Sequence, residues 1–137
     1  MKKNCKELFS YGLHDSVVTD LYLDKTSVCL TFNNGVYNLD TTGKETVLTS
    51  KCTLKLSLVD KREKMIQMYV EIFHISKQSF REIVFQDAST LVKKNSLIIS
   101  NCYYSYFNST ILIDGFLAAK RLQILISNVH DVEFVFS

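Results

Sequence analysis

Proline and tryptophan are absent from this sequence of 137 residues, and glycine occurs only four times. Proline removes a hydrogen bond from the ladder of a central strand, so its absence leaves the strands uninterrupted. It also deprives exposed sheet edges of one common protection against mispairing. Without tryptophan, the nine phenylalanines and seven tyrosines must supply the large side chains of the core.

Neither sign of charge dominates the chain, which carries 16 basic and 14 acidic residues for a formal net charge of +2. A nucleic-acid-binding domain would instead show a basic stripe. No run approaches the ~18 apolar residues of a membrane helix. The basic start at Met1-Lys2-Lys3 leads into no apolar core of signal-peptide length. We therefore expect a cytoplasmic protein that binds neither nucleic acid nor membrane.

The motifs of common cofactor and metal sites are also missing. The four cysteines form no CxxC pair, which disfavours zinc, and in a reducing compartment they are expected to be small buried hydrophobes. The four glycines are isolated and form no phosphate-binding loop, and no nucleophile elbow occurs. We expect no cofactor and no metal, and these absences disfavour an enzyme. The cysteines are Cys5, Cys29, Cys52 and Cys102.

The strongest pattern present is an alternation of apolar and polar residues, which is typical of half-buried strands. It is clearest over 52–58, where every second residue is apolar, and it recurs over 66–72. The hydrophobic fraction of 47% is that of an ordinary globular protein. We predict a single all-β domain over 1–137, mainly antiparallel, with about nine to eleven short strands. The strands would form a meander or Greek key that closes into a barrel or packs as a two-sheet sandwich.

The pair Asn34-Gly35 is the best local signal for a hairpin. Asn-Gly is favoured in two-residue type I′ turns, because both central residues need a positive φ. Such a turn would set Phe32 opposite Tyr37 and Leu30 opposite Leu39, so that large apolar residues meet on one face.

Two further connections are predicted from charge and polarity. Residues 40–50 read as a long loop. The charged run 60–64 is expected to be a solvated turn that joins a strand over 51–59 to a strand over 65–75, because five ionic side chains cannot be buried cheaply.

Residues 79–94 are ambiguous between strand and helix. Ser79-Phe80-Arg81-Glu82 matches a capping box, which would begin a helix. Ile83-Val84-Phe85 is β-branched and aromatic, which disfavours a helix slightly. We favour a strand over 80–86, followed by a turn and a short strand near 90–93.

The sequence predicts the structure of the C-terminal end of the chain more clearly than that of the N-terminal end. Residues 2–13 are expected to form either a short helix or an extended arm. Towards the C-terminus, a strand over 97–107 is predicted to pair with one over 110–117, and further strands follow over 122–127 and 132–136. The last strand alternates almost to the terminus, so we expect it to be integral to a sheet.

His14-Asp15-Ser16 contains the residue types of a hydrolytic triad, and His14 with Asp15 could ligate a metal. Three consecutive residues on an extended chain point in different directions, however, and cannot converge as a triad. We therefore favour a local turn held by Asp15 or Ser16. Glu71 could act as a general base at the mouth of a barrel, although solvent exposure or a partner lysine explains it equally well.

A crowded aromatic segment is the main candidate for a binding surface. Tyrosine is enriched at protein interfaces, because it provides a large contact area at little entropic cost. A fully packed sandwich strand is the alternative for the same segment. The charged turn would add rim charges that orient a partner. The predicted partner-binding residues are Tyr103, Tyr104, Tyr106, Phe107, Lys61, Arg62 and Glu63.

Two short segments carry a resemblance to a known group. Leu13-His14-Asp15-Ser16-Val17 and the closing segment Asn128-Val129-His130-Asp131-Val132-Glu133-Phe134 resemble small bacterial β proteins. Some of those proteins are assigned as immunity proteins of polymorphic toxin systems. The resemblance implies inhibition of a toxin domain by binding, inside the producing cell, and defines no catalytic residues.

Our first hypothesis is therefore a non-enzymatic protein-binding module that neutralises a toxin. The alternative is a small β-barrel that encloses an apolar small molecule or lipid, supported by the aromatic content and the number of strands. A third hypothesis is an enzyme that uses His14 and Asp15.

Overall fold

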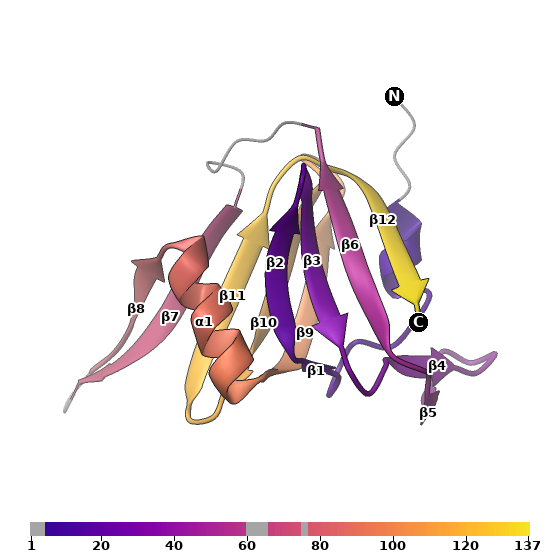
Figure 1. Cartoon of the computed structure of the whole chain (residues 1–137), viewed down its shortest axis with the longest axis horizontal. Helices are drawn as coiled ribbons and strands as arrows, with labels where there is room; N and C mark the ends of the chain where they lie inside the picture. The colour runs from indigo at the N-terminus through magenta and orange to yellow at the C-terminus, as the bar shows by residue number, and fades with distance from the viewer. Residues whose placement is uncertain (1–4, 60–65, 75–76) are drawn as a thin grey trace.

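Two antiparallel sheets packed face to face form the frame of the protein (Figure 1). The computed structural model describes residues 5–59, 66–74 and 77–137. Within these ranges lie twelve strands, one α-helix and one 3-10 helix. The structure confirms the predicted all-β, mainly antiparallel class. It has one strand more than the upper end of the predicted number, and the described sheets do not close into a barrel.

The larger sheet has six strands in the order β1-β9-β10-β11-β7-β8. The smaller sheet has four strands in the order β12-β6-β3-β2, and a separate arm consists of β4 and β5. The strands of the larger sheet are β1 (Val17–Val18), β7 (Ile66–His74), β8 (Lys77–Ile83), β9 (Leu97–Ser105), β10 (Thr110–Leu117) and β11 (Lys120–Ile126). The remaining strands are β2 (Asp20–Asp24), β3 (Ser27–Phe32), β4 (Tyr37–Leu39), β5 (Glu45–Leu48), β6 (Cys52–Leu58) and β12 (Val129–Phe136).

The core lies between the two sheets and follows the predicted alternation. On β6, every second residue from Cys52 to Leu58 is buried. On β10 and β11, the buried apolar residues include Ile111, Ile113, Leu122 and Ile124. These side chains fill the space between the sheets, so the interior is a packed core.

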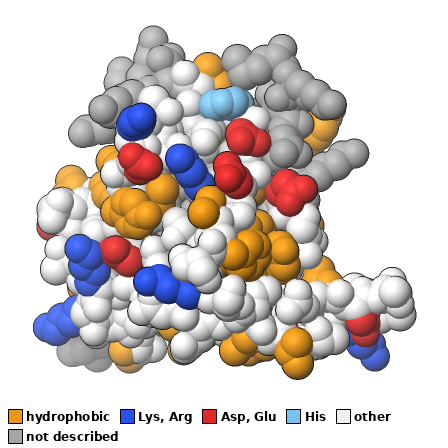
Figure 2. Space-filling view, turned by 45° about the vertical axis from the view of Figure 1, so that its right-hand side comes forward, with side chains coloured by type: hydrophobic (Ala, Val, Ile, Leu, Met, Phe, Trp, Pro, Cys, Tyr) orange, Lys and Arg blue, Asp and Glu red, His pale blue; other side chains and the backbone are white. Residues whose placement is uncertain are grey.

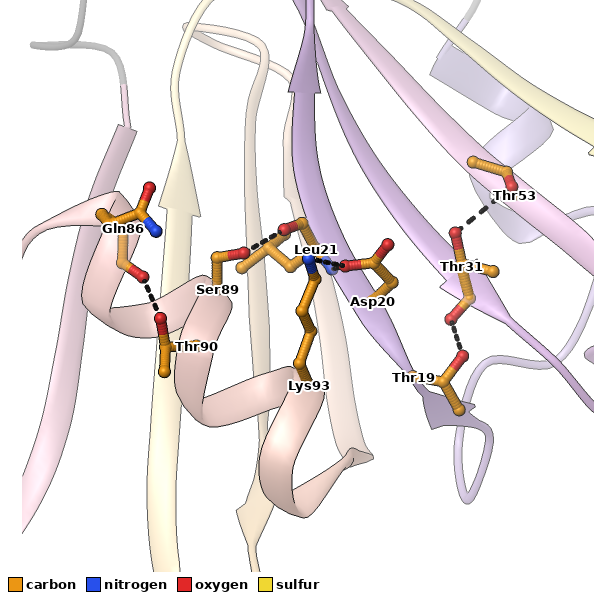
Figure 3. Close-up of polar contacts among 9 residues, drawn as sticks. All are labelled: Thr19, Asp20, Leu21, Thr31, Thr53, Gln86, Ser89, Thr90 and Lys93. Atoms are coloured by element: carbon orange, nitrogen blue, oxygen red, sulfur yellow. Dashed lines mark hydrogen bonds and ion pairs between the residues drawn. The ribbon is translucent and has the colours of Figure 1, made fainter.

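The helix α1 (Phe85–Asn95) packs between the edge strand β2 and strand β7. Ala88 and Val92, one helical turn apart, are its fully buried residues. The Ser89 hydroxyl donates a hydrogen bond of 2.6 Å to the backbone oxygen of Leu21, as Figure 3 shows. The helix thereby covers an edge of the smaller sheet that would otherwise be open to mispairing.

The hairpin predicted at Asn34-Gly35 is wrong. A turn forms one residue earlier, over 32–35, since the Gly35 amide donates to the Phe32 oxygen at 3.0 Å; Gly35 has a φ of +80°, but Asn34 does not have the positive φ that a type I′ turn requires. The chain then turns away, because both sides of β3 are already paired with β2 and β6. Tyr37 pairs with Leu48 of β5 instead of Phe32.

The hairpin predicted to join 51–59 to 65–75 is also wrong, because its two strands belong to different sheets. β6 pairs with β3 and β12, whereas β7 pairs with β8 and β11. The predicted long loop over 40–50 contains the exposed strand β5.

Residues 79–94, for which the sequence allowed either a strand or a helix, form part of a strand and then a helix. The strand predicted over 80–86 corresponds to the end of β8, but the strand predicted near 90–93 is wrong, because α1 occupies those residues. The helix begins at Phe85, six residues after Ser79, so the capping box does not start it. Burial of Ala88 and Val92 against the sheets outweighs the weak local preference for a strand.

The predictions for the two ends of the chain are largely confirmed. β9 pairs with β10 and β12 pairs with β6, so the last strand is integral to the smaller sheet. The N-terminal segment contains a 3-10 helix, η1 (Cys5–Phe9), that contacts β12 and buries Leu8. The four cysteines are free, and Cys5, Cys29 and Cys52 are buried as predicted, whereas Cys102 is only partly buried. Desolvation raises the pKa of the Cys102 thiol to about 12.

Two valines of β12 test the assignment of its faces. Val132 is 1% exposed and Val135 is 45% exposed. We expect Val132→Ala to lower the free energy of unfolding by about 2 kcal/mol, because it removes buried methyl groups and leaves a cavity. Val135→Ala is the matched control and should change it by less than about 0.5 kcal/mol. Urea denaturation of both variants measures the difference; equal effects would contradict the assigned faces.

Candidate functional site

One face of the larger sheet lies open to solvent. The smaller sheet and α1 pack on its inner side, and no part of the chain that the structure describes packs over the other side. In Figure 1 the smaller sheet lies in front of β9 and β10, so this open side is turned away from the viewer. We call it the outer face. Its residues include Val17, Ile98, Asn101, Tyr103, Leu112, Asp114, Phe116, Arg121, Gln123, Leu125, Gln67, Tyr69, Glu71, Phe80 and Glu82.

The strand register brings large apolar side chains together on the outer face. Phe116 of β10 pairs with Ile98 of β9 on one side and with Arg121 of β11 on the other. Leu112 pairs with Tyr103 in the same way. Ile98, Tyr103, Phe116 and Phe80 are all exposed. Apolar side chains that are exposed close together often mark a surface that binds another molecule, whereas single exposed apolar residues are common on any protein.

An ion pair lies among these apolar residues. The Arg121 guanidinium donates a hydrogen bond to Asp114 Oδ2, and this bond raises the pKa of Arg121. The guanidinium carbon also lies 6.0 Å from the ring centre of Phe80 and 5.9 Å from that of Phe116. Both distances are compatible with cation–π attraction. The arginine is therefore held in one orientation by a carboxylate and two aromatic rings.

A second carboxylate, that of Glu71, lies close to this pair. Leu122 pairs with Val70, so the next step of the same register sets Arg121 beside Glu71. Glu71 is only 2% exposed, and its Oε2 has no hydrogen-bond partner. Asp114 Oδ1 and Arg121 Nε are also buried without partners. Such atoms are rare in folded proteins, because an unpaired buried polar group destabilises the fold.

A β-bulge positions Asp114. On β9, Ser100 is an extra residue, since Asn101 opposes Asp114 and Ile99 opposes Gly115. A Cβ atom at Gly115 would lie 2.5 Å from the backbone oxygen of Ile98, so the glycine permits the close approach of the two strands. Sequence analysis did not identify Asp114, although one signal was available: an Asp-Gly pair inside an otherwise apolar strand.

The predicted aromatic segment is distributed over three environments. Tyr103 lies on the outer face. Tyr106 and Phe107 lie in the turn between β9 and β10 and are 87% and 97% exposed. Tyr104 points to the opposite side and packs against the core, so its replacement is expected to affect stability. Lys61, Arg62 and Glu63 lie outside the described residues.

His14, Asp15 and Ser16 form a local turn in the structure. Asp15 has a φ of +67°, and its carboxylate lies 3.1 Å from His14 Nδ1. The Ser16 hydroxyl donates to the Gly12 oxygen at 3.2 Å. The side chains of His14 and Asp15 are both more than half exposed. Across the described ranges, no three His, Cys, Asp or Glu side chains gather in a way that could hold a metal ion.

The outer side of the smaller sheet is more polar. Ser27 and Ser57 share a hydrogen bond of 3.0 Å, and Thr31 and Thr53 face each other at 3.5 Å (Figure 3). Lys55 pairs with Asp24 at 3.8 Å. Figure 2, in which the side of β12 comes forward, shows charged side chains of both signs between separate apolar patches. This side lacks a buried charged cluster like that of the outer face among the described residues.

Comparison with known proteins finds no family model, no curated protein and no solved structure that matches the chain. None of the described helices is both long enough and apolar enough to cross a membrane.

The ion pair can be tested through the stability of the free protein. In Arg121→Met the apolar stem is retained, but Asp114 is left buried without a partner. We expect the free energy of unfolding to fall by about 1–3 kcal/mol. Lys120→Met removes the same charge at the exposed neighbouring residue and should have little effect. Urea denaturation compares the two; an equal loss in both variants would show that the pair contributes nothing.

Proposed function

We propose that this chain is a non-enzymatic protein-binding module that contacts its partner through the outer face. One observation carries the proposal: large apolar side chains are exposed together on a sheet face that no described element covers. Burying them against a partner would release the water that now hydrates them.

The composition of the outer face also favours a protein partner. Tyr, Phe and Arg are enriched at protein interfaces, and binding energy is concentrated in a few such side chains. Arg121 is already held by Asp114, Phe80 and Phe116, so its ordering adds little entropic cost to binding. Tyr106 and Phe107 extend the apolar surface at the turn between β9 and β10.

The resemblance to immunity proteins supports a more specific form of the proposal, in which the partner is a toxin domain neutralised by binding. Segment 13–17 ends in β1, where Val17 pairs with Ile98 of the outer face, and segment 128–134 leads into and lies on β12 of the smaller sheet. Of these residues, Val17 is the one on the outer face. The resemblance therefore supports the proposed class of protein, and the exposed apolar side chains of the outer face support the proposed location of the interface.

An apolar ligand is the second candidate. A cleft of about 570 Å³ lies between the start of α1, the start of β7, the end of β8, and β2. Its lining includes Leu23, Met68, Ile83 and Phe85. The volume is within the usual range for small-molecule sites. Native mass spectrometry of the purified protein tests this candidate, since a copurifying lipid or small molecule would add a defined mass.

Capture of a partner from the native organism tests the first candidate. Tagged protein is used to retain binding proteins, and the affinity of the captured protein is then measured for Tyr103→Ala. We expect affinity to fall about tenfold, because an interface tyrosine typically contributes more than 1 kcal/mol. Tyr22→Ala is the matched control, since Tyr22 is also an exposed tyrosine but lies in the smaller sheet.

Both tyrosine variants should keep the melting temperature of the unmodified protein. A partner whose affinity falls in Tyr22→Ala and not in Tyr103→Ala would place the interface on the smaller sheet and contradict the proposal. Failure to capture any protein would leave the ligand candidate as the better account.

A further inference from the structure

We propose that the outer face receives a basic side chain of the partner, an arginine or lysine, which binds to the carboxylates of Glu71 and Asp114. The inference rests on the proposed function, because it names the chemistry of the group that binds to the same surface. It depends on the charges, burial and hydrogen bonds of three residues on adjacent strands.

The charges within the cluster do not balance. Glu71 and Asp114 contribute two carboxylates, whereas Arg121 contributes a single guanidinium, which binds one oxygen of Asp114. Glu71 Oε2 and Asp114 Oδ1 are left buried and without a donor. Arginine and lysine carry donors and no acceptors, so either side chain supplies what both oxygens lack.

The surroundings of the cluster would strengthen such a pair. Phe80 and Phe116 lie on either side of it, and Ile98 lies beyond Phe116. A partner that covers these apolar side chains excludes water, and a charge pair is stronger where water is excluded. The aromatic rings also attract cations.

The sign of the cluster argues against other occupants of the outer face. A second copy of this chain, packed face to face, would bring two clusters of net negative charge together, which is unfavourable. An acidic partner would meet the same repulsion. A basic side chain is the occupant that the cluster complements.

Arg121 determines how the incoming group arrives. Its side chain is 34% exposed, whereas that of Asp114 is 6% exposed. A basic side chain of the partner therefore enters beside Arg121, which keeps its hydrogen bond to Asp114 Oδ2 while the incoming donors bind Glu71 Oε2 and Asp114 Oδ1.

The test uses the intact protein and N-acetyl-L-arginine amide as the probe. Nitrogen-15-labelled protein is titrated with the probe, and amide shifts are followed by NMR. The neutral isostere N-acetyl-L-citrulline amide is titrated in parallel. We expect saturable shifts with arginine, confined to β7, β10 and β11, with a dissociation constant on the order of millimolar, and no saturable shifts with citrulline.

Glu71→Gln tests the role of the carboxylate. The substitution keeps the shape of the side chain, and we expect it to weaken binding of the arginine probe about tenfold, the factor for one charge-assisted hydrogen bond. Glu133→Gln is the matched control, because Glu133 is an exposed glutamate on β12 of the smaller sheet, away from the outer face. It should bind the probe as the unmodified protein does.

Several results would overturn the inference: no saturable shifts with arginine, equal shifts with citrulline, or equal binding by Glu71→Gln and the unmodified protein. The citrulline comparison is made on the unmodified protein, so it stands even if Glu71→Gln does not fold. A captured partner that depends on Tyr103 but not on Glu71 would contradict this inference and leave the proposed function intact. Arginine binding without any captured partner would count against the proposed function, and would show only that the carboxylates of the outer face bind a basic group.

Discussion

Successive side chains of a β-strand point to opposite faces of the sheet, so a residue buried in the core is followed by one on the other face. β10 and β11 bury Ile111, Ile113, Leu122 and Ile124 between the sheets. The intervening residues must therefore lie on the outer face, which has no second layer among the described elements. The packing of the core thus places Asp114, Phe116 and Arg121 side by side on an open surface.

The outer face is less favourable for the stability of the free protein than a wholly polar surface would be. It exposes aromatic side chains and holds a buried carboxylate, Glu71, with an unpaired oxygen. Natural proteins often retain locally unfavourable groups at binding sites, where a partner later compensates them. This pattern distinguishes the outer face from the smaller sheet, whose serine and threonine side chains satisfy one another.

Local patterns in the sequence predicted the elements better than their pairing. The alternation over 52–58 was enough to identify β6 and its buried face. A turn was predicted close to its true place, which is one residue earlier at 32–35, but the hairpin predicted there was wrong, because β2 and β6 pair with β3 from other parts of the chain. The same limit affects the candidate site. Glu71, Asp114 and Arg121 are brought together by strand register, which no single segment encodes.

The aromatic segment predicted as a binding surface is exposed only in part. Tyr103, Tyr106 and Phe107 are exposed, whereas Tyr104 packs inward because neighbouring residues of a strand alternate. Arg121 was not identified from the sequence because it falls between the strands predicted over 110–117 and 122–127. Its role depends on Phe80 and Phe116, which approach it only in the folded sheet.

Hydroxyl-radical footprinting tests the central claim most directly, because it reports the exposure of individual side chains in the free protein and in the complex. The account predicts strong oxidation of Tyr103 and Phe116 in the free protein and protection of both when a captured partner is bound. Tyr22 should react equally in both states. Protection of Tyr22 with continued oxidation of Tyr103 and Phe116 would contradict the claim that the outer face is the binding surface.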